Sequence, residues 1–425
     1  MIIIHDMNKL PPPLKRHLTP LVRQALDTFP VVVLTGARQT GKSTLIRELL
    51  TPHTREYLTL DDLDVLERAQ QEPDALVAAN KRMTIDEIQR SPDLLLAIKR
   101  SVDRDRRPGR FLLSGSANLA LMRSVSETLA GRAVYLTLYP FTMAERAGLG
   151  AVGRWQALVN DPSQFEGAHP RFGRLDETLL QSGFPPAALS PNPATRRTWL
   201  DGYVRTYLER DLQALSAIGH LVDFRRLMRM AALRSSALVN QSDLARDAGL
   251  TQPTAHRYLN LLETSYLLHR LPAYAVNRTK RLIKTPRLFF CDTGLAAYLA
   301  GIDTAADLEK GGLLGPLLET LVVSDLLAWR EGCRPMPDIL YWRLASGAEV
   351  DLVIEQAGTV IPIEIKATSR PRVGDTAHLR LFLDDYGKAA PHGLLLHTGE
   401  RAERIADRIW AIPLSVALGV DQSSQ

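Results

Sequence analysis

The chain has 425 residues, of which 45% are hydrophobic and 23% charged, and its net charge is +5. This is the composition of a soluble globular protein, but a single core stops growing at roughly 250 to 300 residues, so we expect several domains. No stretch approaches the roughly 20 apolar residues of a membrane helix, which argues against a membrane protein. The two cysteines lack metal-ligand spacing and the start of the chain lacks a secretory signal, so we expect a cytoplasmic protein with free thiols.

Short apolar runs rich in β-formers alternate with helical patterns in the first third of the chain. Residues 1–27 precede them and are expected to form a leader packed against the first domain. Strands that alternate with helices predict a parallel α/β sheet. The expected strands are residues 30–34, 57–60, 82–85, 111–113 and 133–138.

A Gly-rich loop lies between the first expected strand and a helical pattern. Its glycines let the backbone turn N–H groups toward phosphate oxygens, and the start of the helix adds positive charge. Lys42 would contact the outer phosphates, and the Ser43 hydroxyl would bind Mg²⁺. The sequence therefore predicts an ATP site formed by Gly36, Ala37, Arg38, Gln39, Thr40, Gly41, Lys42, Ser43 and Thr44.

Acidic and hydroxyl side chains end the next strands of the predicted sheet. Asp86 would hold the Mg²⁺ of the nucleotide, and Glu87 would polarise the attacking water. Ser114 ends the fourth strand and is expected to sense the γ-phosphate or to orient that water, with Ser116 and Asn118 as alternatives. An ordinary Ser- and Gly-rich turn is the competing interpretation.

Arg132 comes directly before the fifth expected strand. In that place it could reach the γ-phosphate of a neighbouring subunit as an arginine finger, which stabilises charge during phosphoryl transfer. This interpretation implies a homo-oligomer. A plain surface arginine is the alternative.

Residues 241–262 have the rhythm of a helix-turn-helix. Gly249 permits the turn, and Thr251 caps the second helix. DNA is the expected partner of this segment and of a basic wing that follows, and a protein-interaction or lid module is the alternative. The expected DNA contacts are Thr254, His256, Arg257, Arg278, Lys280 and Arg281.

Carboxylates near the C-terminus have the D…E-x-K spacing of restriction-endonuclease-like nucleases. Asp351 and Glu364 would lie on adjacent strands and hold Mg²⁺, and Lys366 would position or activate the water. Glu319 on the preceding helix could complete the acidic cluster. A binding module without nuclease activity is the alternative.

These motifs together resemble prokaryotic AAA-type ATPases that carry a C-terminal domain of unknown function. The resemblance runs in order along nearly the whole chain. It implies an ATPase core, a winged-helix segment and a nuclease-like C-terminal domain. The matching residues are 33–43, 85–89, 113–116, 129–132, 138–141, 183–185, 290–295, 349–351 and 363–366.

We therefore expect an α/β protein with a parallel-sheet P-loop ATPase core of AAA type. A helical and winged-helix region and an α/β restriction-endonuclease-like domain would follow. The expected ranges are 1–27 for the leader, 28–148 for the core, 149–218 for a helical lid or linker, 219–305 for the winged helix and 306–425 for the C-terminal domain.

The leading functional hypothesis is a DNA-associated ATPase that uses ATP and Mg²⁺ and couples its nucleotide state to the winged helix and the nuclease-like domain. The second hypothesis is a nucleotide-switched regulatory or binding protein with an inactive nuclease-like domain. A sequence-specific transcription regulator is a third.

Overall fold

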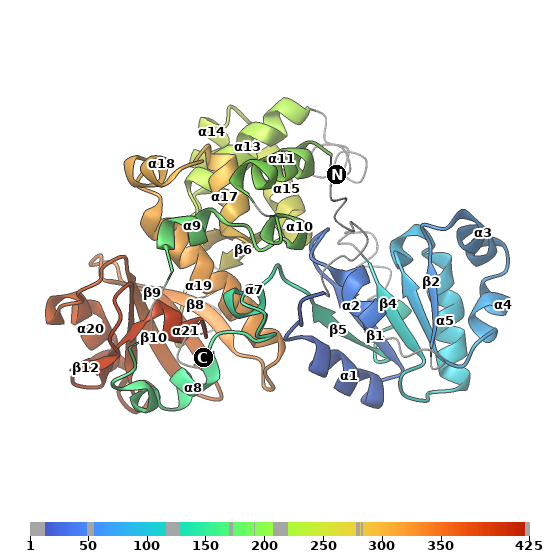
Figure 1. Cartoon of the computed structure of the whole chain (residues 1–425), viewed down its shortest axis with the longest axis horizontal. Helices are drawn as coiled ribbons and strands as arrows, with labels where there is room; N and C mark the ends of the chain where they lie inside the picture. Colours follow the sequence, from blue (N-terminus) through green and yellow to red (C-terminus); the bar gives the residue numbers. More distant parts are fainter. Residues whose placement is uncertain are drawn as a thin grey trace, which may run out of the picture.

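The chain forms lobes that meet at the centre of the molecule (Figure 1). We call residues 13–138 the N-terminal lobe, 173–310 the helical lobe and 314–420 the C-terminal lobe. The computed structural model describes residues 13–48, 55–115, 128–169, 173–190, 192–206, 220–277, 281 and 284–420.

The N-terminal lobe is built on a five-stranded sheet in the order β2-β3-β4-β1-β5, and every neighbouring pair is parallel. The expected parallel sheet is therefore confirmed. Each strand begins or ends within a few residues of its expected position. The strands are β1 (Val31–Thr35), β2 (Glu56–Thr59), β3 (Met83–Asp86), β4 (Phe111–Ser114) and β5 (Ala133–Thr137).

Helices cover both faces of this sheet, because its strands are apolar on both sides. Val31 and Val33 pack in a core with the three helices on one face, whereas Val32 and Leu34 pack in a second core with the two helices on the other. The first face carries α3 (Leu63–Gln71), α4 (Pro73–Ala78) and α5 (Asp93–Arg104), and the second carries α1 (Thr19–Thr28) and α2 (Lys42–Glu48).

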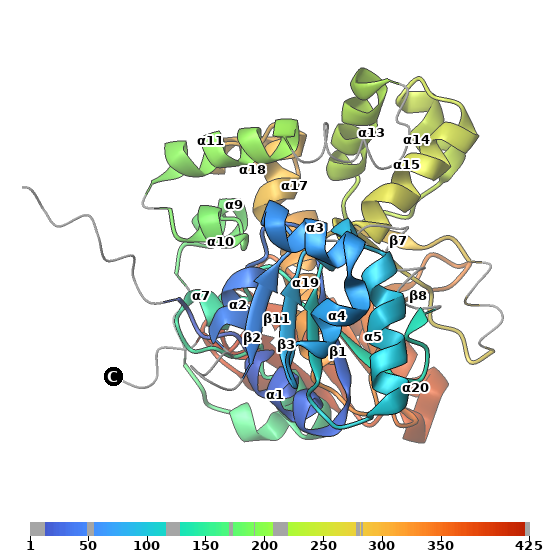
Figure 2. The same ribbon diagram turned by 90° about the vertical axis from the view of Figure 1, so that its right-hand side faces the viewer.

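The helical lobe lies above and between the other two lobes (Figure 1), and α13, α14 and α15 form its upper right part in Figure 2. The expected turn at Gly249 is present, with φ of +66°, and the Thr251 side chain accepts a hydrogen bond from Thr254 N as a cap. Strands β6 (Leu268–Leu271) and β7 (Arg287–Phe290) pair antiparallel after these helices. The helices are α9 (Leu175–Leu180), α10 (Pro185–Ala188), α11 (Pro193–Tyr203), α13 (Leu221–Leu233), α14 (Gln241–Asp247), α15 (Gln252–Thr264), α17 (Thr293–Ala300) and α18 (Ala305–Lys310).

The C-terminal lobe contains a six-stranded mixed sheet in the order β12-β13-β11-β10-β9-β8. Phe382 of α20 packs on one face of the sheet with Trp342, and the buried side of α19 packs on the other. The elements are α19 (Leu314–Glu331), β8 (Asp338–Arg343), β9 (Glu349–Gln356), β10 (Thr359–Lys366), α20 (Ala377–Tyr386), β11 (Gly393–His397), β12 (Glu403–Ala406), β13 (Ile409–Pro413) and α21 (Leu414–Ala417).

The described parts of the range 149–218, which we expected to form a helical lid or linker, pack on two different lobes. Its first part, with α8 (Trp155–Asn160) and the short helix η2 (Pro162–Phe165), packs on the C-terminal lobe. There the Trp155 indole donates a hydrogen bond to Asp325 Oδ1 of α19 at 2.7 Å. The described later part, with α9 to α11, packs instead on α17 in the helical lobe.

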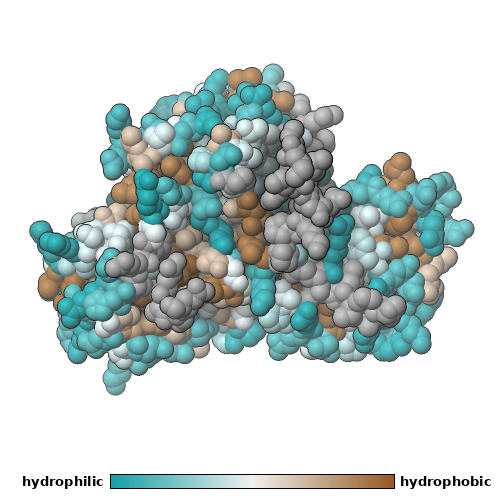
Figure 3. Space-filling model, viewed as in Figure 1, coloured by the Kyte–Doolittle hydropathy of each residue, from teal (hydrophilic) through white to brown (hydrophobic). Residues whose placement is uncertain are grey.

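The outer surface in Figure 3 is mostly hydrophilic, and hydrophobic residues gather where the helical lobe meets the two lower lobes. One core explains this arrangement, because it runs from α11 through α17 and α19 into the C-terminal sheet. In the part of the chain that the structure describes, no helix combines the length and apolar character needed to cross a bilayer.

Candidate active site

The Gly-rich loop joins the carboxyl end of β1, which lies between the parallel strands β4 and β5, to the start of α2. Gly36 has φ of +136°, and a Cβ there would lie 2.3 Å from the carbonyl oxygen of Leu138. Gly41 has φ of +91° and begins the turn into α2. Both positions therefore require glycine, one for close approach and both for conformation. Ser43 and Thr44 follow in the first turn of α2.

Lys42 is buried beneath the loop with its ammonium group facing loop carbonyls. Its Nζ donates hydrogen bonds to Gly36 O at 3.1 Å and to Ala37 O at 2.8 Å. Burial lowers the pKa of Lys42 to about 8, against the attraction of the Glu87 and Asp86 carboxylates. A buried amine and a loop of glycines suit the phosphates of a nucleoside triphosphate, and two nearby carboxylates suit its Mg²⁺.

Asp86 ends β3 and is held in place by three donors. Ser114 Oγ donates to its Oδ1 at 2.6 Å, and the Tyr57 hydroxyl donates to its Oδ2 at 3.0 Å. The Glu87 N–H donates to Oδ1 at 3.1 Å. Because β4 lies between β1 and β3, Ser114 stands between the phosphate loop and this carboxylate. Tyr57 was not foreseen, whereas Ser116 and Asn118 lie outside the described residues.

Glu87 follows Asp86 with φ of +56°, an uncommon conformation for a residue with a side chain. Its carboxylate accepts a hydrogen bond from Gln89 Nε2. Burial raises the pKa of Glu87, and the nearby Asp86 charge adds to the rise. The backbone conformation turns Glu87 out of the strand at the same edge as Lys42.

Arg132 lies at the opposite edge of the sheet from the phosphate loop, because it precedes β5 and that strand is parallel to β1. Its guanidinium binds Asp103 of α5 with both ends, at 2.6 and 3.0 Å. The structure therefore does not bring Arg132 to the phosphate loop of its own chain. As an arginine finger, Arg132 could therefore act only on the nucleotide of a second copy of the chain.

Arg16 is an important residue of this site that sequence reasoning missed. It is buried and donates hydrogen bonds to Thr40 O of the loop at 2.7 Å and to Tyr139 O after β5 at 2.6 Å. Its Nε donates to Glu145 Oε1 at 3.0 Å, and His17 binds the same carboxylate. Although burial opposes ionisation, the Arg16 and His17 charges lower the pKa of Glu145 to about 2.

Side chains from the other lobes contact the edge of the sheet that carries the phosphate loop. The Tyr266 hydroxyl, between α15 and β6, donates to Thr35 Oγ1 at the end of β1 at 3.2 Å. Tyr203 of α11 donates to Arg38 O in the loop at 3.4 Å. Glu331, the last residue of α19, accepts from the N–H of Thr137 in β5 at 3.1 Å. The loop is thus part of the contact between lobes.

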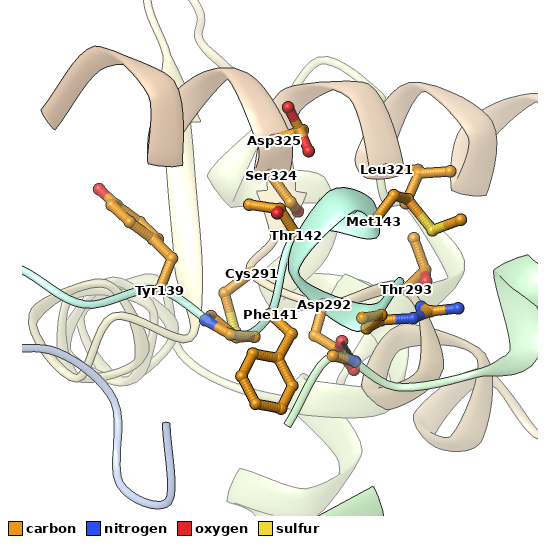
Figure 4. A pocket seen from close by; sticks show the side chains of 13 residues that line it. Tyr139, Phe141, Thr142, Met143, Cys291, Asp292, Thr293, Leu321, Ser324 and Asp325 are labelled. Atoms are coloured by element: carbon orange, nitrogen blue, oxygen red, sulfur yellow. Dashed lines mark hydrogen bonds between the residues drawn. The ribbon is translucent and has the colours of Figure 1, made fainter. Parts of the chain in front are cut away.

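A small cavity lies where these lobes meet (Figure 4). Its lining comes from residues 139–143, Arg146, Gly183, residues 291–293 at the start of α17, and α19. Asp292 caps α17 by accepting from Leu295 N at 2.7 Å, and it also accepts from Gly183 N at 2.5 Å. Burial raises the pKa of Asp292. These hydrogen bonds give the aspartate a structural role as a cap that joins two segments.

The expected DNA contacts fall into two separate places. Thr254, His256 and Arg257 lie in the first half of α15, where His256 and Arg257 are exposed. Arg281 is instead buried against the C-terminal lobe, where it binds Glu355 of β9 and lies 4.9 Å from the centre of the Tyr274 ring. Its guanidinium is satisfied within the chain, so the expected phosphate contact is not available. Arg278 and Lys280 lie outside the described residues.

The carboxylates expected to form a metal site do come together, around an arginine that we did not anticipate. Arg287 of β7 places Nη2 2.7 Å from Glu319 Oε2 and Nη1 3.7 Å from Asp351 Oδ1. Lys366 Nζ donates to Glu364 Oε1 at 2.6 Å. In the described part of the chain no three acidic, imidazole or thiol groups are arranged to hold a metal ion.

Burial raises the pKa values of these carboxylates, in Glu319 to about 8 and in Glu364 to about 7. The pKa of Asp351 is also raised by burial, although Arg287 opposes the rise. Arg287 and Lys366 therefore offset the effect of burial on these pKa values only in part.

Comparison with known proteins agrees with the geometry of the first site. A family model described as an AAA domain matches residues 28–147. Residues 173–306 match a domain of unknown function (DUF8612), and residues 314–417 match another (DUF4143). The parallel sheet, the glycine cradle and the matched model define residues 28–147 as an AAA-type ATPase domain, the class of module that binds and hydrolyses ATP.

Full-length relatives then give the family. The chain is 32% identical to the uncharacterized protein Rv2008c of Mycobacterium tuberculosis over 401 aligned residues. These residues cover 94% of this chain and 83% of that protein. This chain belongs to the same family. An uncharacterized protein of Haemophilus influenzae is 22% identical over 390 residues, which cover 86% of this chain and 89% of that protein. The solved Walker-type ATPase PABY2304 of Pyrococcus abyssi is similar with 15% identity and a TM-score of 0.40, over 68% of this chain and 99% of that chain.

Proposed function

We propose that this protein is a DNA-associated ATPase whose nucleotide state controls how its helical and C-terminal lobes pack. One observation carries the proposal: Tyr266 and Glu331 bind the ends of β1 and β5, next to the phosphate loop. Any movement of the loop on binding or hydrolysis would act on these contacts. ATP binding and hydrolysis would in this way change the packing of the helical and C-terminal lobes.

The residues of the site suit nucleotide hydrolysis. Lys42 and the loop N–H groups would hold the phosphates, and Ser43 and Asp86 would hold Mg²⁺. The bound metal would neutralise phosphate charge. Glu87 would accept the proton of the attacking water at its carboxylate, and its raised pKa makes it a better base. Ser114 orients Asp86 through its 2.6 Å hydrogen bond.

The first experiment separates hydrolysis from coupling. Lys42→Ala should abolish ATP binding. Tyr266→Phe should keep hydrolysis but lose the effect of ATP on duplex DNA binding, because it removes only the hydroxyl that contacts β1. Tyr135→Phe is the matched control, since the Tyr135 hydroxyl is buried without a hydrogen-bond partner. Unchanged ATP dependence in Tyr266→Phe would contradict the coupling, and a wild-type protein that neither hydrolyses ATP nor binds DNA would refute the function.

Helix α15 supports the DNA part of the proposal. Two helices joined at Gly249 are followed by the antiparallel pair β6–β7, and we interpret this order of elements as a winged helix. Thr254, His256 and Arg257 would face DNA from α15. Arg257→Ala should then weaken duplex binding, with little change if α15 only contacts protein.

A homo-oligomer is proposed from the position of Arg132. Its guanidinium could reach the phosphates of a neighbouring subunit, in exchange for its bond to Asp103. Mixing Arg132→Ala chains, which keep an intact phosphate loop, with Lys42→Ala chains, which keep the arginine, should restore ATPase activity if the finger acts between subunits. Mixtures that stay inactive would point to a surface role.

The second candidate function is a nucleotide-switched binding protein whose nuclease-like domain does not cleave. It is favoured by Arg287, because a guanidinium among Glu319 and Asp351 occupies the place where a nuclease would put a metal cation. Incubation with duplex, single-stranded and branched DNA in Mg²⁺ or Mn²⁺ decides the matter. Cleavage that disappears in Asp351→Asn or Lys366→Ala supports a nuclease, and the absence of cleavage on all substrates supports the binding protein.

A further inference from the structure

Arginines come directly before four strands of the N-terminal sheet. Arg55 precedes β2, Arg82 precedes β3, Arg110 precedes β4 and Arg132 precedes β5. Because all strands are parallel, every one of these arginines lies at the amino edge of the sheet, opposite the phosphate loop. Adjacent strands are about 4.8 Å apart. Arg132 is paired with Asp103, so the free positive charge gathers on the side of the edge formed by β2, β3 and β4.

A groove of about 770 Å³ opens at this edge, beside the strands β2, β3 and β4. Five of its lining residues are cationic and only one is acidic. The acid is Glu56, which accepts a hydrogen bond from Asn80. The cations are Arg55, Lys81, Arg82, Arg107 and Arg110.

Two of the arginines form a fixed floor. Arg55 donates to Thr84 Oγ1 at 3.1 Å and to Met83 O at 2.6 Å, and Arg110 donates to Ser101 O at 2.8 Å. Arg110 is 8% exposed, and its buried Nε has no hydrogen-bond partner. Carbonyl and hydroxyl groups hold both side chains. Arg55 has no acidic partner among the described residues, whereas Arg110 lies 3.7 Å from an oxygen of Asp105, so the charge of Arg55 is the less compensated of the two.

The rim of the groove carries cations that are open to solvent. Lys81 and Arg82 are exposed and have no acidic partner among the described residues. Arg107 is paired with Asp105 on the outer side. Burial and the neighbouring Arg82 charge lower the pKa of Arg55 to about 10, as expected where like charges lie close together.

The chemistry of the groove selects a phosphate backbone. Fixed guanidinium groups bind phosphate oxygens well, and a wide row of cations suits a repeating anion better than a single small one. None of the lining residues is aromatic, so bases have nothing to stack on. Contacts of this kind position nucleic acid without reading its sequence.

We propose that the amino edge of the N-terminal sheet binds the phosphate backbone of DNA, independently of sequence. The inference rests on the proposed DNA-associated function and adds a second surface to it. DNA bound there lies at the far edge of the sheet from the nucleotide, so the ATPase core itself holds the polyanion while α15 makes a separate contact.

The test uses the full-length protein and a fluorescein-labelled duplex in an anisotropy titration at several salt concentrations. The variant Lys81→Ala/Arg82→Ala removes two exposed cations and leaves the arginine floor intact. Lys388→Ala/Arg401→Ala is the control, since it removes the same charge from exposed sites on the C-terminal lobe. The loss of two phosphate contacts corresponds to a salt slope smaller by about 2 and to affinity weakened by about 60-fold at 0.1 M salt.

Three results would overturn the proposal in distinguishable ways. If the wild type and both variants bind DNA equally, the groove is not a DNA-binding site, although the proposed DNA-associated function still holds. Absence of DNA binding by the wild type removes the proposed function as well. A groove variant that binds DNA normally but changes the mass of the assembly would show that this edge is a contact between copies of the chain. ATPase activity without DNA should be the same in all three proteins.

Discussion

Replacing Arg16 by methionine tests whether the leader supports the phosphate loop. The buried guanidinium binds Glu145, Thr40 O and Tyr139 O, and methionine keeps the apolar stem but makes none of these bonds. Removing one partner of a buried ion pair costs about 3 to 5 kcal/mol, because the other charge stays buried. The lost bonds to carbonyl groups add to this cost, whereas the remaining His17–Glu145 contact reduces it, so we expect a loss of about 4 kcal/mol of unfolding free energy.

The assay is urea unfolding followed by circular dichroism, combined with calorimetric titration of ATP. ATP affinity should fall at least about tenfold, since Thr40 lies in the loop and loses its anchor. Arg23→Met is the control, because Arg23 is exposed on α1. The double variant Arg16→Met/Glu145→Gln should recover part of the stability. A single variant as stable as the control, or a double variant whose losses simply add, would refute the reasoning.

Three further predictions concern single ionisable groups. Because burial lowers the pKa of Lys42 to about 8, ATP binding at pH 8 should take up about half a proton, measured by calorimetry in buffers of different ionisation enthalpy; no uptake would contradict it. Burial raises the pKa of Glu319 to about 8, so the folded state holds a proton that the unfolded state releases above about pH 4.5. Stability should therefore fall from pH 5 to pH 8 by on the order of 3 kcal/mol, and Glu319→Gln should flatten this dependence in urea unfolding, whereas an unchanged slope would rule it out. Glu87→Gln should lower ATP turnover by about 10²-fold or more and leave ATP affinity nearly unchanged, and normal turnover would exclude Glu87 as the base.

Local patterns were sufficient to predict the N-terminal sheet and its loop. The strands are apolar on both faces, and the glycines lie where the backbone needs them, so pattern and structure agree at Gly36 and Gly41. Asp86 and Ser114 were each predicted at a strand end, and they meet because parallel strands end at the same edge of the sheet. Parts of the site that depend on neighbours in sequence were therefore predictable.

Contacts between distant positions were not predictable. Arg16 and Glu145 are 129 positions apart, and nothing near either residue indicates the other. Arg287 begins an apolar strand, and nothing in the neighbouring sequence indicates that its guanidinium would lie between Glu319 and Asp351. Arg281 was misread for the same reason: a basic run indicates an exposed surface, but Glu355 from another lobe binds its guanidinium.

The packing of residues 152–168 on the C-terminal lobe has a consequence for synthesis of the chain. Arg154 N donates a hydrogen bond to Ala417 O at 2.8 Å, and Ala402 N donates one to Ala168 O at 3.1 Å. Residues 152–168 therefore pack against residues that the ribosome adds near the end of synthesis. During translation the Trp155 face stays uncovered until the final strands emerge from the ribosome. A fragment that begins at residue 306 would likewise expose the apolar surface that Trp155 covers, and we expect it to aggregate.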